Sequence, residues 1–247
     1  MAIKRYFASI DNTITNAFKT DLRTRGTGSN MGASDVLEVF SLYGQQDSAS
    51  SELSRVLVQF PMDQITTDRS ASVIPTSGNV DFYLRLFNAK HSQTLPKNYN
   101  MIVAAVEKPW NEGTGLDMEG YKDIDQSNWI KASSTTDWTN QGGDYRNGPG
   151  FSFTASFDSG VEDIEINISS LVERWANDTT KPDALQTIPN YGVGVFMAPT
   201  EEAADRSYYT KKFFARGTEF FYKRPCIEAR WNSSTKDDRG NFFYSSS

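Results

Sequence analysis

Apolar and polar residues alternate along most of this chain in short runs with a period of two. In residues 36–44 (VLEVFSLYG) the alternating apolar positions are Val36 or Leu37, Val39 and Leu42. This period places one set of side chains on one face of a β-strand. Similar runs, separated by clusters of Gly, Asn, Asp and Ser, occupy residues 54–62, 80–89, 100–108, 150–158, 164–168, 191–198, 211–216, 220–225 and 226–231. Many short strands with turns between them indicate a β-sandwich or barrel.

One segment has a helical pattern instead. In residues 166–179 (INISSLVERWANDT), Ser170 and Glu173 match the S-x-x-E capping box, and Leu171 and Trp175 stand four apart on one face. So short a helix must pack onto the sandwich, where we expect it to close an open end. The pattern predicts an all-β, jelly-roll-like antiparallel β-sandwich with one short helix near residues 169–177.

Composition narrows the classes of protein that the chain can belong to. Its 247 residues include 13% aromatics, which favour strands, and its net charge of −6 argues against a nucleic-acid binder. A single Cys (Cys226) excludes a disulfide framework, and the single His (His91) excludes multi-histidine metal sites. His91 lies in a polar segment without a nucleophile elbow, so we interpret it as an exposed loop residue. No apolar run approaches the length of a membrane span, so we expect no membrane insertion.

Residues 105–123 (AVEKPWNEGTGLDMEGYKD) allow three interpretations. A glycosidase would need Glu112 and a second carboxylate at a fixed separation, and several acids are available. A calcium site would use oxygen ligands on Gly-bearing loops, here Glu112, Asp117, Glu119 and Asp144, although the order D-x-N-x-D-G is absent. The third interpretation is a structural corner, which we favour: Asn111 and Gly113 make a turn, and Trp110, Trp129 and Trp138 cover the end of the sandwich. We therefore expect no enzymatic activity and no obligatory cofactor.

Charge is unevenly distributed along the chain. Residues 105–165 carry twelve acids and four bases, whereas residues 206–230 carry seven bases and two acids. Two solvated faces of opposite sign would explain this, and so would docking between copies or onto a charged neighbour. In the second case the interface would include Lys211, Lys212, Arg216 and Arg230.

Two short segments repeat one local pattern. Asn30 precedes Gly32, and Asn190 precedes Gly192, in each case just before a predicted strand. An Asn can bond the backbone two residues further on in an Asx-turn, and a Gly supplies the positive φ that a corner needs.

These landmarks, in this order, resemble the DNRLRE-type domain, a jelly-roll sandwich related to carbohydrate-binding modules. The resemblance spans residues 6 to 231: Asp11, Thr13 and Ile14 before Asn30 and Gly32, then SRVLVQF with Asp63 and Ile65, DFYLRLFNA, VEKPWNEG with Trp110, DWTNQGGDY, IEINISSLVERW with Asn167 and Trp175, PNYGVGVFM with Asn190 and Gly192, and YKRPCIEARW with Arg224 and Pro225. It implies one domain over residues 1–232, followed by a polar tail, residues 233–247, that a partner would order.

The resemblance also implies that segments 190–197 and 224–231 are adjacent strands. Alternation then predicts that Ile227, Ala229 and Trp231 face inward, and that Cys226, Glu228 and Arg230 share the outward side.

The N-terminus, MAIKRYFASIDN, has no apolar export signal, unlike secreted members of this family. The chain resembles instead structural proteins of marine tailed phages. The expected function is that of a non-enzymatic virion protein of the neck, tail or head, assembled in the host cytoplasm, present in several symmetric copies and bound to other virion proteins. The alternative is a carbohydrate-binding module that adheres to a host or marine glycan.

Overall fold

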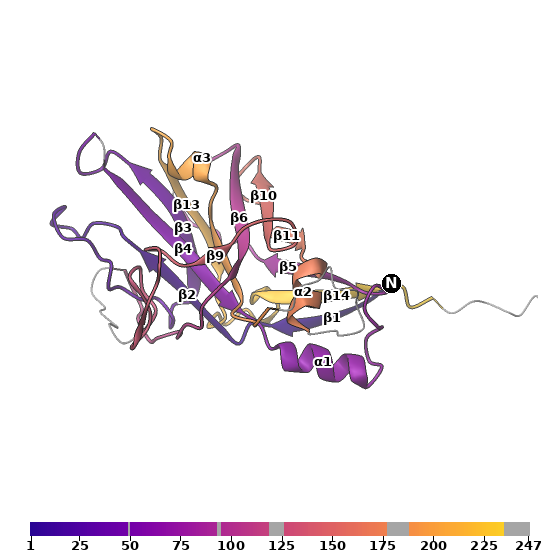
Figure 1. Cartoon of the computed structure of the whole chain (residues 1–247). Coiled ribbons are helices and arrows are strands. Elements are labelled where there is room, and N and C mark those ends of the chain that lie inside the picture. Colours follow the sequence, from indigo (N-terminus) through magenta and orange to yellow (C-terminus); the bar gives the residue numbers. More distant parts are fainter. Residues whose placement is uncertain (49, 93–94, 119–125, 177–187, 235–247) are drawn as a thin grey trace, which may run out of the picture.

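The computed structural model arranges the chain as an all-β sandwich of two antiparallel sheets, in agreement with the predicted fold class (Figure 1). It describes residues 1–48, 50–92, 95–118, 126–176 and 188–234. The smaller sheet has the order β1 (Ala2–Phe7), β14 (Cys226–Trp231), β5 (Asp81–Leu86) and β11 (Ile164–Asn167).

The larger sheet has eight strands and curls around one side of the molecule (Figure 1). Its main path is β10 (Ser152–Phe157), β6 (Tyr99–Val106), β12 (Val193–Met197), β4 (Ser51–Gln59), β3 (Val36–Tyr43) and β13 (Tyr208–Phe214). Two further strands join it from the side, β2 (Ile10–Thr15) on β4 and β9 (Tyr145–Arg146) on β6, and a separate small hairpin consists of β7 (Lys131–Ser133) and β8 (Thr136–Asp137).

The main core lies between the two sheets. The alternating residues that the sequence assigns to one face meet there, with Val56 and Val58 from β4 and Leu84 and Leu86 from β5. Each of these side chains is fully buried. Burial of an aliphatic side chain contributes roughly 1.5–3 kcal/mol, so the residues of the period-two pattern stabilise the packing of the two sheets.

A second, smaller core covers the outer face of the larger sheet. Leu57 points away from its neighbours Val56 and Val58 and packs with Trp110, Trp129 and Trp138. The three tryptophans therefore cover a sheet face, and the prediction that they cover the end of the sandwich is wrong. Alternation allows this result, because Leu57 and Leu53 on the outward side of β4 supply apolar surface for the second core.

The described residues contain three α-helices rather than one. α1 (Met62–Ser70) follows β4 directly and lies next to β1 (Figure 1). The family resemblance implies a strand at these residues of α1. α2 (Ser169–Trp175) is the predicted helix, and α3 (Pro199–Glu202) is a single turn after β12. Pro61 follows β4 and is the N-cap residue of α1. It cannot continue the strand ladder, because proline has no N–H donor.

The predicted capping box of α2 is absent. The N-cap residue is Ile168, which makes no side-chain cap bond, and the carboxylate of Glu173 instead accepts two hydrogen bonds from Arg69 of α1, at 2.9 and 2.7 Å. Ser169 accepts a bond from the Phe82 amide of β5. Tertiary contacts thus fix this helix to both α1 and the smaller sheet.

β12 and β14 belong to different sheets, so the predicted adjacency of these two strands is wrong. Ile227 and Ala229 do face the core. Residues 220–225, predicted as a strand, instead contain a 3₁₀ turn over Phe221–Lys223. Pro225 ends this segment, and its carbonyl accepts the Ala8 amide.

Candidate functional site

Glu112, the possible catalytic acid or calcium ligand, is part of an internal ion pair. Its carboxylate accepts bonds from Arg216 at 3.0 and 2.7 Å and from the Asp11 amide at 2.8 Å. Asp11 is itself buried and accepts the Arg216 amide. Burial raises the pKa of Asp11 to about 7, and the neighbouring Glu112 charge adds to this effect. Glu112 therefore joins β2, the loop after β6 and the segment after β13.

Asn30 fastens the same loop from the other side. Its buried amide donates to the carbonyls of Glu112 and Ser127, at 2.8 and 2.7 Å. Its oxygen accepts the amides of Gly32 and Gly115, so all four of its hydrogen-bonding positions are used. The bond to Gly32 is the predicted Asx-turn. The glycine is required by close approach, since a Cβ at position 32 would lie 2.3 Å from the Glu112 carbonyl oxygen.

Asn190 repeats this turn just before β12. Its oxygen accepts the Gly192 amide, and its amide donates to the Phe60 carbonyl. Gly192 has a φ of 79°, and a Cβ there would lie 2.1 Å from the Val58 carbonyl oxygen. Both Asn-x-Gly segments are thus structural corners.

Two of the four predicted calcium ligands, Asp144 and Glu112, lie in separate ion pairs. Asp144 pairs with Lys108 at 2.9 Å and accepts the amides of Thr139 and Asn140, which together lower its pKa to about 2 although burial opposes the shift. Glu112 belongs to the separate Arg216 cluster described above. Glu119 lies outside the described residues, and within them no group of three or more His, Cys, Asp or Glu residues could hold a metal ion.

The four basic residues predicted as an interface all have internal partners. Lys211 is fully buried, and its ammonium donates to the Asn88 side chain and to the carbonyls of Gly160 and Glu162, at 2.7, 2.9 and 2.7 Å. Burial lowers the pKa of Lys211 to about 8. Lys212 pairs with Glu38 at 2.5 Å, and the partners of the other two are Glu112 for Arg216 and Glu165 and Glu228 for Arg230. The assignment of Lys211 to an interface is wrong.

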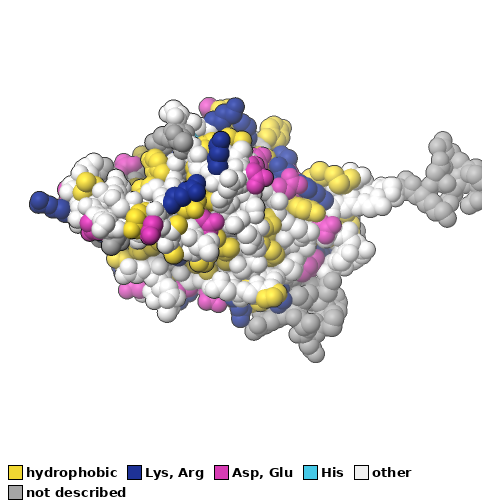
Figure 2. All heavy atoms as spheres, turned by 90° about the horizontal axis from the view of Figure 1, so that it is seen from above, with side chains coloured by type: hydrophobic (Ala, Val, Ile, Leu, Met, Phe, Trp, Pro, Cys, Tyr) yellow, Lys and Arg dark blue, Asp and Glu magenta, His cyan; other side chains and the backbone are white. Residues whose placement is uncertain are grey.

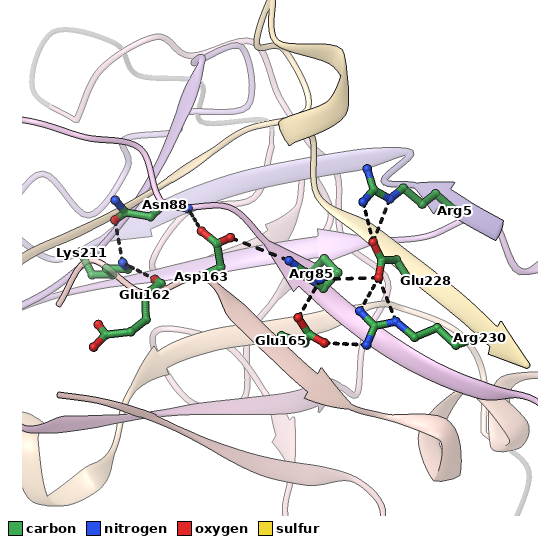
Figure 3. A network of polar contacts seen from close by, with 9 residues as sticks. All are labelled: Arg5, Arg85, Asn88, Glu162, Asp163, Glu165, Lys211, Glu228 and Arg230. Atoms are coloured by element: carbon green, nitrogen blue, oxygen red, sulfur yellow. Dashed lines mark hydrogen bonds and ion pairs between the residues drawn. The ribbon is translucent and has the colours of Figure 1, made fainter. Parts of the chain in front are cut away.

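A cluster of three arginines surrounds Glu228 on the outer face of the smaller sheet (Figure 3). Glu228 is 1% exposed and accepts bonds from Arg5 and Arg230, with Arg85 at 3.5 Å. These hydrogen bonds lower the pKa of Glu228 against the opposing effect of burial. Alternation correctly places Glu228 and Cys226 on the outward side, but both are buried by their neighbours.

The cluster also shows where the two oppositely charged stretches of sequence meet. Glu165 of the acidic stretch bridges Arg85 and Arg230, and Glu162 lies beside Lys211 of the basic stretch (Figure 3). On the face shown in Figure 2, basic and acidic side chains are mixed with hydrophobic ones. Two residues of the basic stretch, Arg216 and Arg230, are therefore paired with carboxylates of the acidic stretch inside one molecule.

Three consecutive aromatic residues form the feature that sequence reasoning missed. Phe220, Phe221 and Tyr222, called the aromatic patch below, are 50%, 48% and 74% exposed. Phe221 packs on Phe7 with ring centroids 4.5 Å apart, and Phe220 packs on Phe214 at 5.4 Å. The 3₁₀ turn points the three rings outward, whereas a strand would have alternated them. The run of three aromatics was the available signal.

Arg224, the last residue of this turn region, donates twice to the Thr218 carbonyl, at 3.2 and 3.0 Å. Lys223 places its ammonium 4.8 Å from the Phe214 ring and 5.4 Å from the Phe220 ring. Neither residue has a carboxylate partner among the described residues.

Two clefts flank Trp231 at the end of β14. One, of about 350 Å³, is lined by Met1, Asp81, Tyr83, Arg230, Trp231 and Asn232. The other, of about 500 Å³, lies between Trp231 and the segment after α1 that includes Val73 and Thr76. Trp231 faces inward as predicted and packs against the main core, but it is only half-buried.

Trp175 is buried in the main core, as its place on the predicted helix implies. The polar tail predicted to need a partner lies outside the described residues beyond Ser234. No helix in the described ranges is long and apolar enough to cross a membrane.

Comparison with models of known protein families gives no match, and comparison with curated proteins finds no relative of this chain.

Proposed function

We propose that this protein is a non-enzymatic structural component of a tailed-phage virion, assembled in the host cytoplasm, that acts through contacts with other proteins. The aromatic patch is the observation that carries the proposal. Exposed apolar groups of this kind mark interaction sites on soluble proteins, and aromatic residues are enriched in interface cores. The family resemblance supports the virion as the setting.

The internal ion pairs support the non-enzymatic part of the proposal. A glycosidase needs Glu112 free to act on a glycosidic bond, but this carboxylate accepts bonds from Arg216 and from the Asp11 amide. The wild-type protein should release no reducing sugar from common marine polysaccharides. Release that disappears on Glu112→Gln would contradict the proposal.

The virion role is tested on purified particles of the phage that encodes the chain. Particles are washed at high salt on a density gradient and analysed by quantitative mass spectrometry. We expect the protein at a fixed ratio to the major capsid protein, in a whole multiple of a symmetric copy number. Loss of the protein during washing, or a ratio that varies between preparations, would argue against a structural role.

A second candidate function, glycan binding, is favoured by the smaller cleft beside Trp231. Saccharides are bound by stacking on aromatic rings with polar groups nearby, and this cleft offers Tyr83 and Trp231 with Asp81 and Asn232. Its volume lies within the range of small-molecule sites. Binding to a glycan array that is lost in Trp231→Ala and retained in Leu116→Ser would favour this candidate, since Leu116 is an exposed residue elsewhere.

A further inference from the structure

Two basic side chains lie against the rings of the aromatic patch. The Lys223 ammonium is 4.8 Å from the centroid of the Phe214 ring and 5.4 Å from that of Phe220. The Arg224 guanidinium lies 5.4 Å from the centroid of the Phe221 ring. A cation at such a distance from an aromatic ring is attracted to it. The rings therefore hold both positive charges at the patch itself.

The described residues supply neither cation with a carboxylate. Arg224 uses Nε and Nη2 on the Thr218 carbonyl, and within the described part of the chain its Nη1 makes no hydrogen bond. The exposed Lys223 ammonium makes no hydrogen bond or ion pair there either. Glu219, the acid of the same segment, pairs with neither of them. The patch thus carries two positive charges that can accept a carboxylate from outside the molecule.

A partner that packs on the rings would also take these two cations out of water. Burial of an unpaired charge is costly, because the charge loses its hydration and gains no counter-charge. This chain supplies a carboxylate where it buries an arginine: Arg55 pairs with Glu202 at 2.7 Å, and Arg69 pairs with Glu173 at 2.7 Å. The partner must therefore bring carboxylates together with apolar side chains.

We infer that the aromatic patch, with Lys223 and Arg224, is the docking site for an acidic segment of another protein. The inference rests on the proposed role as an assembly protein and names the chemistry of its partner. In the complex, carboxylates bind the Lys223 ammonium and the Nη1 group of Arg224, and apolar side chains pack on the exposed parts of the rings. Packing on Phe7 and Phe214 holds the rings in place, so little order has to be gained on docking.

The orientation of the rings favours a protein partner over a saccharide. A saccharide stacks on a flat ring face, and several subsites need faces that share a plane. The Phe221 ring makes angles of 49° with Phe7 and 80° with Tyr222, and the Phe220 ring stands at 68° to Phe214. These rings share no plane, and cations already lie over two of them. Side chains of a protein segment can fill the uneven surface that results.

Labelled peptides test the chemistry of the partner by fluorescence anisotropy. The probes are a short peptide of glutamate and leucine and two matched peptides in which glutamine or lysine replaces the glutamate. The acidic peptide should bind the wild-type protein about tenfold or more tightly than the glutamine peptide, and the lysine peptide should not bind. Raised salt should weaken the binding of the acidic peptide, because its contacts are charged.

Substitutions separate the contribution of the cations from that of the rings. Lys223→Glu should weaken binding of the acidic peptide about tenfold, and Lys223→Arg should retain it. Tyr222→Ser should also weaken binding, and circular dichroism should show that it remains folded, because Tyr222 is 74% exposed. Arg23→Glu is the matched change of charge at another exposed position, and Leu116→Ser is the matched loss of an exposed apolar side chain. Both controls should bind as the wild type does.

Carbodiimide cross-linking tests the same contact in purified particles. The reagent joins a lysine ammonium to a carboxylate only where the two groups touch, and it adds no spacer. Mass spectrometry of the treated particles should find Lys223 joined to an aspartate or glutamate of a different virion protein.

The inference is overturned if the wild type binds no acidic peptide at about 1 mM, or if Lys223→Glu binds it as tightly as the wild type does. Self-association or glycan binding that Tyr222→Ser abolishes, without binding of the acidic peptide, would overturn it as well and identify the other occupant.

Failure of the docking site and failure of the virion role give different results. A protein that is absent from washed particles but binds the acidic peptide through Lys223 would refute the virion role and leave the docking site standing. A protein that is present in the particles, but whose Lys223 is joined to no other protein, would refute the docking site and leave the virion role standing.

Discussion

At the scale of single residues, two buried polar side chains hold segments that are far apart in sequence. Lys211 donates to three acceptors, two of them carbonyls of the loop between β10 and β11. Asn30 uses its whole amide group on the loop after β6. Apart from the local bond between Asn30 and Gly32, none of these bonds could be predicted from local sequence, because tertiary structure brings their partners together.

Asn30→Asp should destabilise the protein by about 3 kcal/mol, because two carbonyls lose their donor and face a carboxylate oxygen. Urea unfolding measures the loss. Asn147→Asp, the same change at an exposed position, should cost little. Equal losses in the two variants would show that the amide of Asn30 is not required.

Asp11 predicts a pH dependence of stability. Its pKa is about 7 in the folded protein against an ordinary 3.8, so the folded state holds this proton more tightly than the unfolded state. The resulting stability is present below about pH 4 and is lost as the pH rises through about 7. Asp11→Asn should flatten the profile of unfolding free energy between these limits, whereas Asp205→Asn, at an exposed position, should leave the slope unchanged. Parallel slopes for wild type and Asp11→Asn would contradict the assignment.

At the scale of elements, β14 shows what alternation can and cannot predict. The inward side was correctly predicted from the sequence for Ile227 and Ala229, because these follow the period of a strand. The outward side was predicted to face solvent or a neighbouring molecule, but three arginines from β1, β5 and β14 of the same chain close over Glu228. The burial of Glu228 depends on which strands are neighbours in the sheet. The period of a single strand does not predict that order.

Glu228→Gln should cost about 3 kcal/mol, because it leaves three arginines on the sheet with one carboxylate fewer and retains the shape of the side chain. Glu165→Gln provides the control, since Glu165 contacts two of the same arginines but its side chain is 43% exposed. Thermal unfolding of both variants gives the comparison. A larger loss for Glu165→Gln would mean that burial of the charge does not set its importance.

At the scale of the whole molecule, the two cores share their strands. Leu57 lies in the outer core, while its neighbours Val56 and Val58 lie in the main one. The fold class, most strand positions and both Asn-x-Gly corners could be predicted from the sequence, since each depends on local pattern. The helix α1, the outer core and the aromatic patch could not be predicted, because each depends on the distant segments of the chain against which it packs.

Sharing of strands predicts that the two cores unfold together. Three of the five tryptophans lie in the outer core, so tryptophan fluorescence reports mainly on that core, and far-ultraviolet circular dichroism reports on both sheets. The two urea transitions should coincide in a Trp231→Phe background, which removes the half-exposed reporter. An earlier fluorescence transition would show that the outer core opens on its own.

The pairing of β1 with β14 also has a consequence for synthesis. Ala2 lies opposite Trp231, so the ribosome makes β1 long before it makes the strand that pairs with it. At roughly 5–20 residues per second, β1 waits on the order of ten seconds or more before its partner emerges. The smaller sheet can therefore close only after β14 has emerged, and until then an edge of β1 is open to other nascent chains. We expect a slow, late folding step and a need for chaperone cover during translation.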